Sequence, residues 1–200
     1  MVTIIDYGVG NLSSVDKACK FLGFETEITS DINKILSAKK LILPGVGSCG
    51  DAMEMLKSTG IADAVKKQVE KGTPLMGICL GMQMLFDHSE EGDADCLGLV
   101  SGNIKRFPDD MGLKVPQIGW NSITPNENSR LFKGIEKGSF VYFVHSYYAK
   151  CEDSGDSAAT ADYGINFDVA IEKGNLFATQ FHPEKSGETG LKILQNFLDL

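Results

Sequence analysis

The chain has 200 residues, of which 42% are hydrophobic and 23% charged, and its formal net charge is −8. These values are typical of a globular protein and favour one domain over residues 1–200. An acidic surface repels phosphate backbones, so nucleic-acid binding is not expected as a main role. The chain has no apolar run of about 18 residues that could cross a membrane. Its first residues predict a strand rather than a signal peptide, so we expect a cytoplasmic protein.

The cysteine pattern argues against a metal centre and against a disulfide framework. The five cysteines are an odd number, and no C-x-x-C pair occurs among them. Zinc sites and small disulfide-rich domains normally show such close spacing. We therefore expect free thiols in a reducing compartment, with no metal and no cofactor.

The first half of the chain alternates short apolar runs with helical patterns. The predicted strands are Val2–Ile5, Phe24–Ile28, Lys40–Leu43 and Thr73–Ile78. The predicted helices are Leu12–Leu22, Asp31–Leu36, Asp51–Leu56, Ile61–Glu70 and Leu80–Phe86. Such alternation predicts a parallel sheet with helices on both faces.

The second half of the chain consists mainly of apolar runs joined by turns. The predicted strands are Gly102–Phe107, Val115–Ile123, Val141–Ala149, Ala158–Asp162, Val169–Glu172 and Asn175–Phe181, and a helix over Gly187–Leu198 follows. The sequence therefore predicts an α/β fold. Its central sheet is mostly parallel and flanked by helices, and its second half is rich in antiparallel strands.

A candidate nucleophile lies between the fourth predicted strand and the following helix. Residues 77–81 have the form G-x-C-x-G, centred on Cys79. This is the spacing of a nucleophile elbow, in which glycines leave room for a strained turn. A helix N-terminus favours the thiolate, and the N–H of Leu80 is free to bind an oxyanion. The alternative is a buried structural cysteine between two closely packed glycines.

A candidate base follows the last predicted strand. Proline at position 183 restricts His182 to an extended conformation. In an extended segment the side chains of His182 and Glu184 project to the same side, so the carboxylate can orient the imidazole. A surface His-Pro-Glu turn is the alternative for this segment. Of the other histidines, we expect His88 to be solvated and His145 to lie in the core or in a pocket wall.

A glycine-rich loop over residues 44–50 contains G-x-G-x-x-G, the dinucleotide-binding pattern. We discount nucleotide binding because the loop follows the third predicted strand rather than the first. No acidic residue ends a strand at the expected offset after the loop, where Asp63 lies in a predicted helix instead. The loop can instead present backbone N–H groups to an oxyanion, or be a simple turn.

Taken together, these motifs resemble the class I glutamine amidotransferases, whose fold is flavodoxin-like. The likeness is most specific for the glutaminase subunits of imidazole glycerol phosphate synthase, in histidine biosynthesis. It extends nearly end to end, over residues 5–11, 43–48, 77–83, 117–121, 142–147 and 180–186.

The resemblance implies a Cys79–His182–Glu184 triad that hydrolyses glutamine. It further implies an oxyanion hole formed by the backbone of Leu80 and Val46. The residues that it assigns to glutamine binding are Gly47, Gln83, Glu91, Ser146 and Tyr147. Without the resemblance, Glu91 belongs to an acidic pair that is typical of a solvated loop.

The resemblance also implies a partner. This is a (β/α)8-barrel cyclase that receives ammonia through a tunnel and rearranges the loop at Val46. Positions at or near that interface are Asn11, Trp120, Tyr142 and Lys185. A lone tryptophan is otherwise usually well buried. Cys49 stands where the family often has an aromatic residue, and we interpret it as a packing residue.

Two alternatives stay open from the sequence, and a third is disfavoured. The chain could serve another barrel-coupled amidotransferase, such as a sugar-modifying one, or be a non-catalytic binding module of the same fold. A cysteine-dependent α/β-hydrolase would place its acid before the histidine in chain order, whereas Glu184 follows His182.

Overall fold

The computed structural model describes residues 1–200 and contains one large mixed sheet. Its parallel half has the order β2-β1-β3-β4-β14. The bounds are Thr26–Thr29 (β2), Val2–Ile5 (β1), Leu41–Gly45 (β3), Leu75–Cys79 (β4) and Leu176–Thr179 (β14). All four strands other than β2 are buried along their whole length, which is typical of a sheet covered on both faces.

The other half of this sheet is mainly antiparallel. It continues from β14 through β13, β11 and β7 to the short strands β5 and β6, while β12 and β9 branch from β13. The bounds are Asn166–Lys173 (β13), Tyr147–Cys151 (β11), Gly102–Arg106 (β7), His88–Ser89 (β5), Ala94–Asp95 (β6), Ser157–Asp162 (β12) and Thr124–Pro125 (β9). The predicted α/β class with an antiparallel-rich second half is confirmed.

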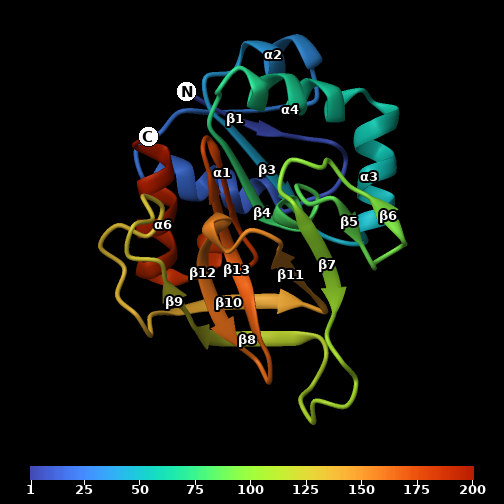
Figure 1. Cartoon of the computed structure of the whole chain (residues 1–200). Helices are drawn as coiled ribbons and strands as arrows, with labels where there is room; N and C mark the ends of the chain where they lie inside the picture. Colours follow the sequence, from blue (N-terminus) through green and yellow to red (C-terminus); the bar gives the residue numbers. More distant parts are fainter.

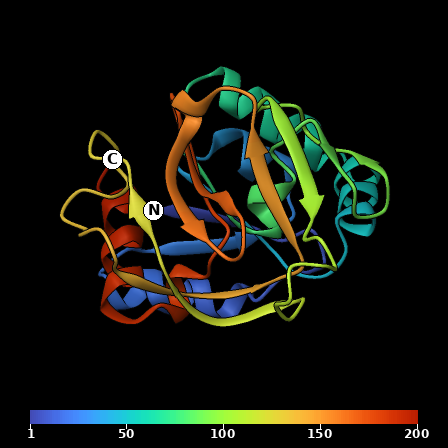
Figure 2. The same cartoon turned by 60° about the horizontal axis from the view of Figure 1, so that its bottom comes forward.

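Helices cover both faces of the sheet (Figure 1). Helices α1 and α6 lie side by side on one face, and α2, α3 and α4 cover the other (Figure 2). The bounds are Leu12–Phe21 (α1), Ile32–Ser37 (α2), Cys49–Ser58 (α3), Ile61–Glu70 (α4) and Gly187–Leu198 (α6). The predicted bounds of α4 and α6 agree with the structure. None of the helices is both long and apolar enough to span a bilayer.

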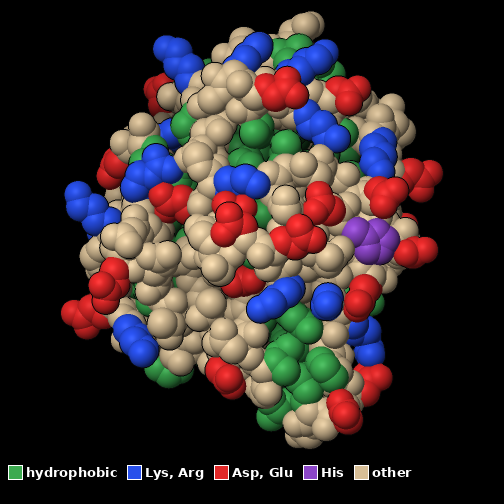
Figure 3. Space-filling model, in the orientation of Figure 1, with side chains coloured by type: hydrophobic (Ala, Val, Ile, Leu, Met, Phe, Trp, Pro, Cys, Tyr) green, Lys and Arg blue, Asp and Glu red, His purple; other side chains and the backbone are tan.

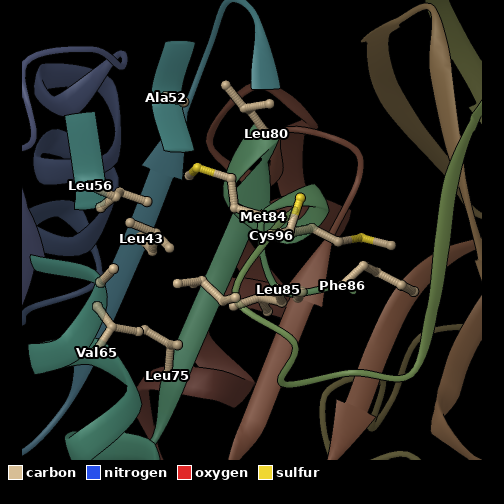
Figure 4. Packing of buried hydrophobic residues seen from close by; sticks show 14 of the residues in the cluster. Leu43, Ala52, Leu56, Val65, Leu75, Leu80, Met84, Leu85, Phe86 and Cys96 are labelled. Atoms are coloured by element: carbon tan, nitrogen blue, oxygen red, sulfur yellow. The ribbon is translucent and has the colours of Figure 1, made fainter. Parts of the chain in front are cut away.

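Each face of the sheet has its own hydrophobic core. Figure 4 shows the core beneath α3 and α4, where Leu43 of β3 and Leu75 of β4 pack toward Leu56 and Val65. The second core lies beneath α1 and α6 and contains Cys79. The end of β4 is therefore held by packing on both sides.

A separate two-stranded sheet consists of β8 (Gln117–Ser122) and β10 (Phe140–His145), paired antiparallel. Here the prediction of a single strand over Val141–Ala149 is wrong. Strand β10 ends at His145, and β11 begins two residues later in the large sheet. The apolar pattern runs through both strands, so it cannot show that the hydrogen-bonding partners change at Ser146.

The predicted helix over Leu80–Phe86 is also wrong in length. Helix α5 spans only Leu80–Gln83. The carbonyl oxygens that would continue it are taken by another segment, since Met84 O and Leu85 O accept from the N–H groups of Leu97 and Leu99. These residues remain buried, so their apolar character is satisfied without a helix.

Candidate active site

Cys79 lies at the junction of β4 and α5 in a sterically strained conformation. Its φ is 56° and its ψ is −112°, a region that non-glycine residues rarely adopt. A Cβ on Gly77 would come within 2.7 Å of the Gly81 carbonyl oxygen, and one on Gly81 within 1.8 Å of Leu43 O. The turn therefore requires both glycines, and its geometry is that of the predicted elbow.

His182 and Glu184 form a buried pair next to Cys79. Nδ1 of His182 lies 2.9 Å from Oε1 of Glu184, and their side chains are 6% and 1% exposed. The Cys79 thiol lines the same pocket as the imidazole and is close enough to raise the His182 pKa. The structure thus brings the three predicted triad residues together in the order cysteine, histidine, carboxylate.

His182 itself is extended, as expected from Pro183, but the expectation that the extended segment continues to Glu184 is wrong. Residues Pro183–Lys185 form a 3-10 turn, η2, in which Lys185 N–H donates to His182 O at 3.0 Å. Proline is well tolerated at the start of a helical turn because its missing N–H would have no partner there. The tight turn, rather than strand periodicity, brings Glu184 back to the imidazole.

The charge state of His182 reflects two opposing influences. Burial by itself lowers the pKa of an imidazole. Hydrogen bonds with Cys79 and Glu184, together with the negative charges of both, outweigh burial and raise the His182 pKa to about 9. His182 is therefore an imidazolium at neutral pH, and a cation of this kind beside a cysteine favours nucleophilic attack by its sulfur.

A buried glutamine, Gln180, contacts the nucleophile from another side. Its Nε2 lies 3.7 Å from Cys79 Sγ, and its Oε1 accepts from Gln83 Nε2 at 2.9 Å. Gln83 Nε2 also donates to the carbonyl oxygen of Tyr147 at 3.3 Å. The sequence interpretation assigned no role to Gln180. A polar glutamine between the apolar residues of β14 and Phe181 was the available signal in the sequence, and it does not indicate the partner.

These residues open onto a pocket of about 340 Å³, within the range of small-molecule sites, roughly 300–1,000 Å³. The two predicted oxyanion-hole residues and all five predicted glutamine-binding residues line it. The full lining is Val46, Gly47, Cys79, Leu80, Gln83, Glu91, Pro116, Val144, His145, Ser146, Tyr147, His182 and Lys185. Pro116 and Val144 were not predicted from the sequence as pocket residues. Pro116 reaches the pocket from the loop before β8, and Val144 reaches it from strand β10.

Glu91 supplies a carboxylate to the pocket rather than to a fully solvated loop. Its Oε2 accepts from the backbone N–H of Cys49 at 2.9 Å, and the residue is only partly exposed. Burial raises the pKa of Glu91, and the nearby charge of Asp51 adds to this, while the Cys49 N–H opposes it. Its neighbour Glu90 is exposed and accepts from the N–H of Arg106 instead.

Cys49 is fully buried at the start of α3, so packing is its structural role. Its Sγ lies 3.6 Å from Sγ of Cys96, and all five cysteines are free thiols. Figure 4 shows Cys96 beside Met84 in the same core.

His145 forms a wall of the pocket and is 6% exposed. Its Nδ1 lies 2.7 Å from Tyr147 O, and its Nε2 lies 2.8 Å from the side-chain amide of Gln117. Burial lowers the His145 pKa to about 4, so the ring is neutral at physiological pH. By contrast, His88 lies at the sheet edge and faces the exposed carboxylates of Asp93 and Asp95.

The four residues expected at a partner interface occupy different environments. Asn11 caps α1, its side chain accepting from Ser14 N–H at 3.4 Å. Trp120 is 56% exposed, so the alternative that it is a buried core residue is wrong. Its ring meets that of Tyr142 edge-on at 6.0 Å, and Lys185 is exposed at the mouth of the pocket.

Trp120 and Tyr142 belong to a larger apolar surface, which we call the outer-sheet face. It is the side of β8 and β10 that points away from the core. Its members are Ile118, Trp120, Phe140, Tyr142 and Val144. Contiguous exposed apolar side chains of this kind mark protein interfaces.

Comparison with known proteins agrees with the site. The model of the class-I glutamine amidotransferase family matches residues 3–200. Imidazole glycerol phosphate synthase subunit HisH of Caldanaerobacter subterraneus subsp. tengcongensis is 50% identical, over 98% of this chain and 97% of the relative. The same subunit of Dehalococcoides mccartyi strain ATCC BAA-2266 is 49% identical, over 100% of this chain and 97% of the relative.

Solved structures share the fold at lower identity. A glutamine amidotransferase crystal structure superposes with a TM-score of 0.78 at 22% identity, covering 100% of this chain and 98% of that chain. PurLQS of Thermotoga maritima superposes with a TM-score of 0.76 at 24% identity, covering 99% of this chain and 97% of that chain. From the matched residues and the 50% identity together, the chain belongs to the class I glutamine amidotransferase family and, within it, to the HisH subunits of imidazole glycerol phosphate synthase.

Proposed function

We propose that residues 1–200 act as a single glutaminase domain, the ammonia-producing subunit of an imidazole glycerol phosphate synthase. The observation that carries this proposal is the buried Cys79–His182–Glu184 arrangement at the base of a pocket that also holds Glu91. A thiolate–imidazolium pair suits acyl transfer from an amide, and the Glu91 carboxylate suits the ammonium group of an amino acid.

The reaction proceeds through a thioester. The Cys79 thiol gives its proton to Nε2 of His182, and the sulfur attacks the side-chain carbonyl carbon of glutamine. Backbone N–H groups of Leu80 and Val46 stabilise the oxyanion. His182 then returns the proton to the leaving amine, ammonia departs, and a thioester forms. Water, deprotonated by His182, hydrolyses the thioester to glutamate and regenerates Cys79.

Glutamine binding uses residues that line the pocket in the free chain. Glu91 pairs with the substrate ammonium, while Gly47, Gln83 and the backbone of Ser146 and Tyr147 hold the rest of the molecule. Support comes from their placement around one cavity that contains the nucleophile.

The outer-sheet face is the docking surface for a (β/α)8-barrel cyclase in a cytoplasmic heterodimer. Val144 belongs both to this face and to the pocket, and Lys185 stands at the pocket mouth. Apolar side chains also gather over the segment between β7 and β8, where Leu113 is exposed (Figure 3). A partner seated there covers the mouth, so ammonia passes to the cyclase, which forms imidazole glycerol phosphate and AICAR.

The partner also completes the oxyanion hole. Val46 is 40% exposed on the loop after β3, and Gly47 has a φ of +93°, so this loop has few packing restraints. A peptide without such restraints can reorient at low cost. Docking turns the Val46 N–H into the pocket, and glutaminase turnover is slow without the cyclase.

Glutamate release from glutamine, measured on the chain alone and with the cyclase and its ligand, tests this function. We expect faster turnover with the cyclase and complete loss in Cys79→Ala. The matched control Cys19→Ala removes a thiol that is also buried in the α1–α6 core and should retain activity. Activity that survives Cys79→Ala would contradict the nucleophile, and equal rates with and without the cyclase would contradict partner activation.

A further inference from the structure

Gln180 is a polar side chain with no solvent exposure, wedged between the nucleophile and Gln83. A buried amide is costly unless both its oxygen and its nitrogen find partners. Two other protein groups are close enough to serve, Gln83 Nε2 at 2.9 Å and Cys79 Sγ at 3.7 Å. The position of Gln180 is therefore explained only if the sulfur is one of its hydrogen-bond partners.

The orientation of the Gln180 amide is fixed by a backbone group. The carbonyl oxygen of Tyr147 only accepts, so the end of the Gln83 amide that faces it at 3.3 Å must be the nitrogen. The same nitrogen contacts Gln180, so the oxygen of Gln180 must point at Gln83. Its N–H group is left facing Cys79 Sγ, where it can only donate.

We propose that Gln180 is a further catalytic residue, whose amide N–H donates a hydrogen bond to the Cys79 sulfur and stabilises its thiolate. This inference rests on the proposed glutaminase function. No proton is transferred by Gln180: the Cys79 proton goes to His182, and Gln180 binds the negative sulfur that remains. The nucleophile is then held from two directions, by the imidazolium of His182 and by the amide.

The expected effect follows from the strength of a hydrogen bond to a charged acceptor. Such a bond contributes roughly tenfold to hundredfold to an equilibrium. Its loss should therefore raise the midpoint pH of thiolate formation at Cys79 by about one to two units. A purely space-filling glutamine would not affect that midpoint, which separates the two roles.

Two variants of similar size test the donor. Gln180→Met keeps the length and removes the amide, and Gln180→Glu keeps the shape but places an oxygen near the sulfur. Iodoacetamide alkylation of the Cys79 peptide, followed by mass spectrometry across pH in the full chain, reports thiolate formation without any turnover. We expect the midpoint pH to rise in Gln180→Met and to rise further in Gln180→Glu. In the cyclase complex, kcat should fall roughly tenfold or more, with KM changed less.

Gln68 offers a matched control. It is 2% exposed and donates to the Ala38 carbonyl oxygen at 3.2 Å, on the side of α4 that packs against α2. Gln68→Met should lower stability without moving the alkylation midpoint or kcat. A folded Gln180→Met or Gln180→Glu variant with the wild-type midpoint overturns the proposal. Because alkylation needs no glutamine turnover, this outcome is distinct from failure of the glutaminase function, which Cys79→Ala reports.

Discussion

Glu184 holds His182 with one oxygen only: Oε1 lies 2.9 Å from Nδ1, while Oε2 is buried without a hydrogen-bond partner. A buried carboxylate with an unused oxygen depends strongly on the one cation beside it. The imidazolium of His182 and the carboxylate of Glu184 therefore stabilise each other. Burial lowers the His182 pKa, and this contact together with Cys79 on the other side of the ring raises it.

Replacing that carboxylate should weaken the base. In Glu184→Gln the negative charge that helps to raise the His182 pKa is lost, so the pKa falls below its value of about 9. We expect kcat/KM for glutamine to drop on the order of a hundredfold or more, as for the loss of an oriented base. The alkaline limb of the pH–rate profile should also move to lower pH. Glu188→Gln, an exposed change at the start of α6, is the control and should leave both unchanged.

His145 should make stability dependent on pH. Its pKa is lowered by burial from 6.5 to about 4, so the folded chain binds fewer protons than the unfolded chain between these values. The free energy of unfolding therefore contains the full contribution of neutral His145 above about pH 6.5. It decreases by at most about 3 kcal/mol as the pH falls toward 4. Urea unfolding at several pH values should show this loss in wild type and in His88→Gln, but much less in His145→Gln. An unchanged pH dependence in His145→Gln would contradict the assignment.

The two glycines of the elbow should be far less replaceable than glycines in open turns. A Cβ at Gly81 would stand 1.8 Å from the backbone oxygen of Leu43, which cannot move without shifting β3. We expect Gly81→Ala to destabilise the fold by several kcal/mol, about 4 or more, as overpacking against backbone does. Gly23 also has a positive φ, but nothing lies near its missing Cβ, so Gly23→Ala should cost only about 1 kcal/mol. Similar melting temperatures for the two variants would refute the steric argument.

The outer-sheet face should matter for the complex and not for the isolated chain. Trp120→Ala removes a large, 56% exposed side chain whose ring packs edge-on against Tyr142. We expect at least about tenfold weaker binding to the cyclase, because exposed aromatic residues often dominate interfaces. Phe21→Ala is the control: this phenylalanine is 78% exposed at the far end of α1. Calorimetry should show a weaker affinity for the cyclase in Trp120→Ala and an unchanged one in Phe21→Ala. Equal affinities of the two variants would show that this face is not part of the interface.

The parts of the site that depend on local sterics were predictable from the sequence. The spacing of Gly77, Cys79 and Gly81 after an apolar run is enough to predict a strained turn, because only glycine fits beside it. The pocket residues Gly47 and Glu91, in contrast, came from the resemblance and not from local pattern. The structure brings them within one cavity through segments that are distant in sequence.

Features that depend on distant partners could not be predicted. The length of α5 is limited by N–H groups of residues 97–100, which bind the carbonyl oxygens of residues 84–86 directly after it. Similarly, Gln180 has partners about a hundred positions earlier, so nothing in its neighbourhood indicates the contact with Cys79. The exposure of Trp120 reflects a two-stranded sheet that has one face packed and one free, a choice that alternating residues alone do not reveal.

The backbone of Tyr142 joins the outer sheet to the catalytic base. Its N–H donates to Ser186 Oγ at 2.9 Å, and its carbonyl oxygen accepts from His182 N–H at 3.1 Å. Strand β10 is therefore tied to residues 182–186 by two hydrogen bonds, one on each side of the Tyr142 residue. A change in the tilt of the outer sheet would strain these two bonds, so we expect the protein surface at β10 to influence where the imidazole stands relative to the sulfur.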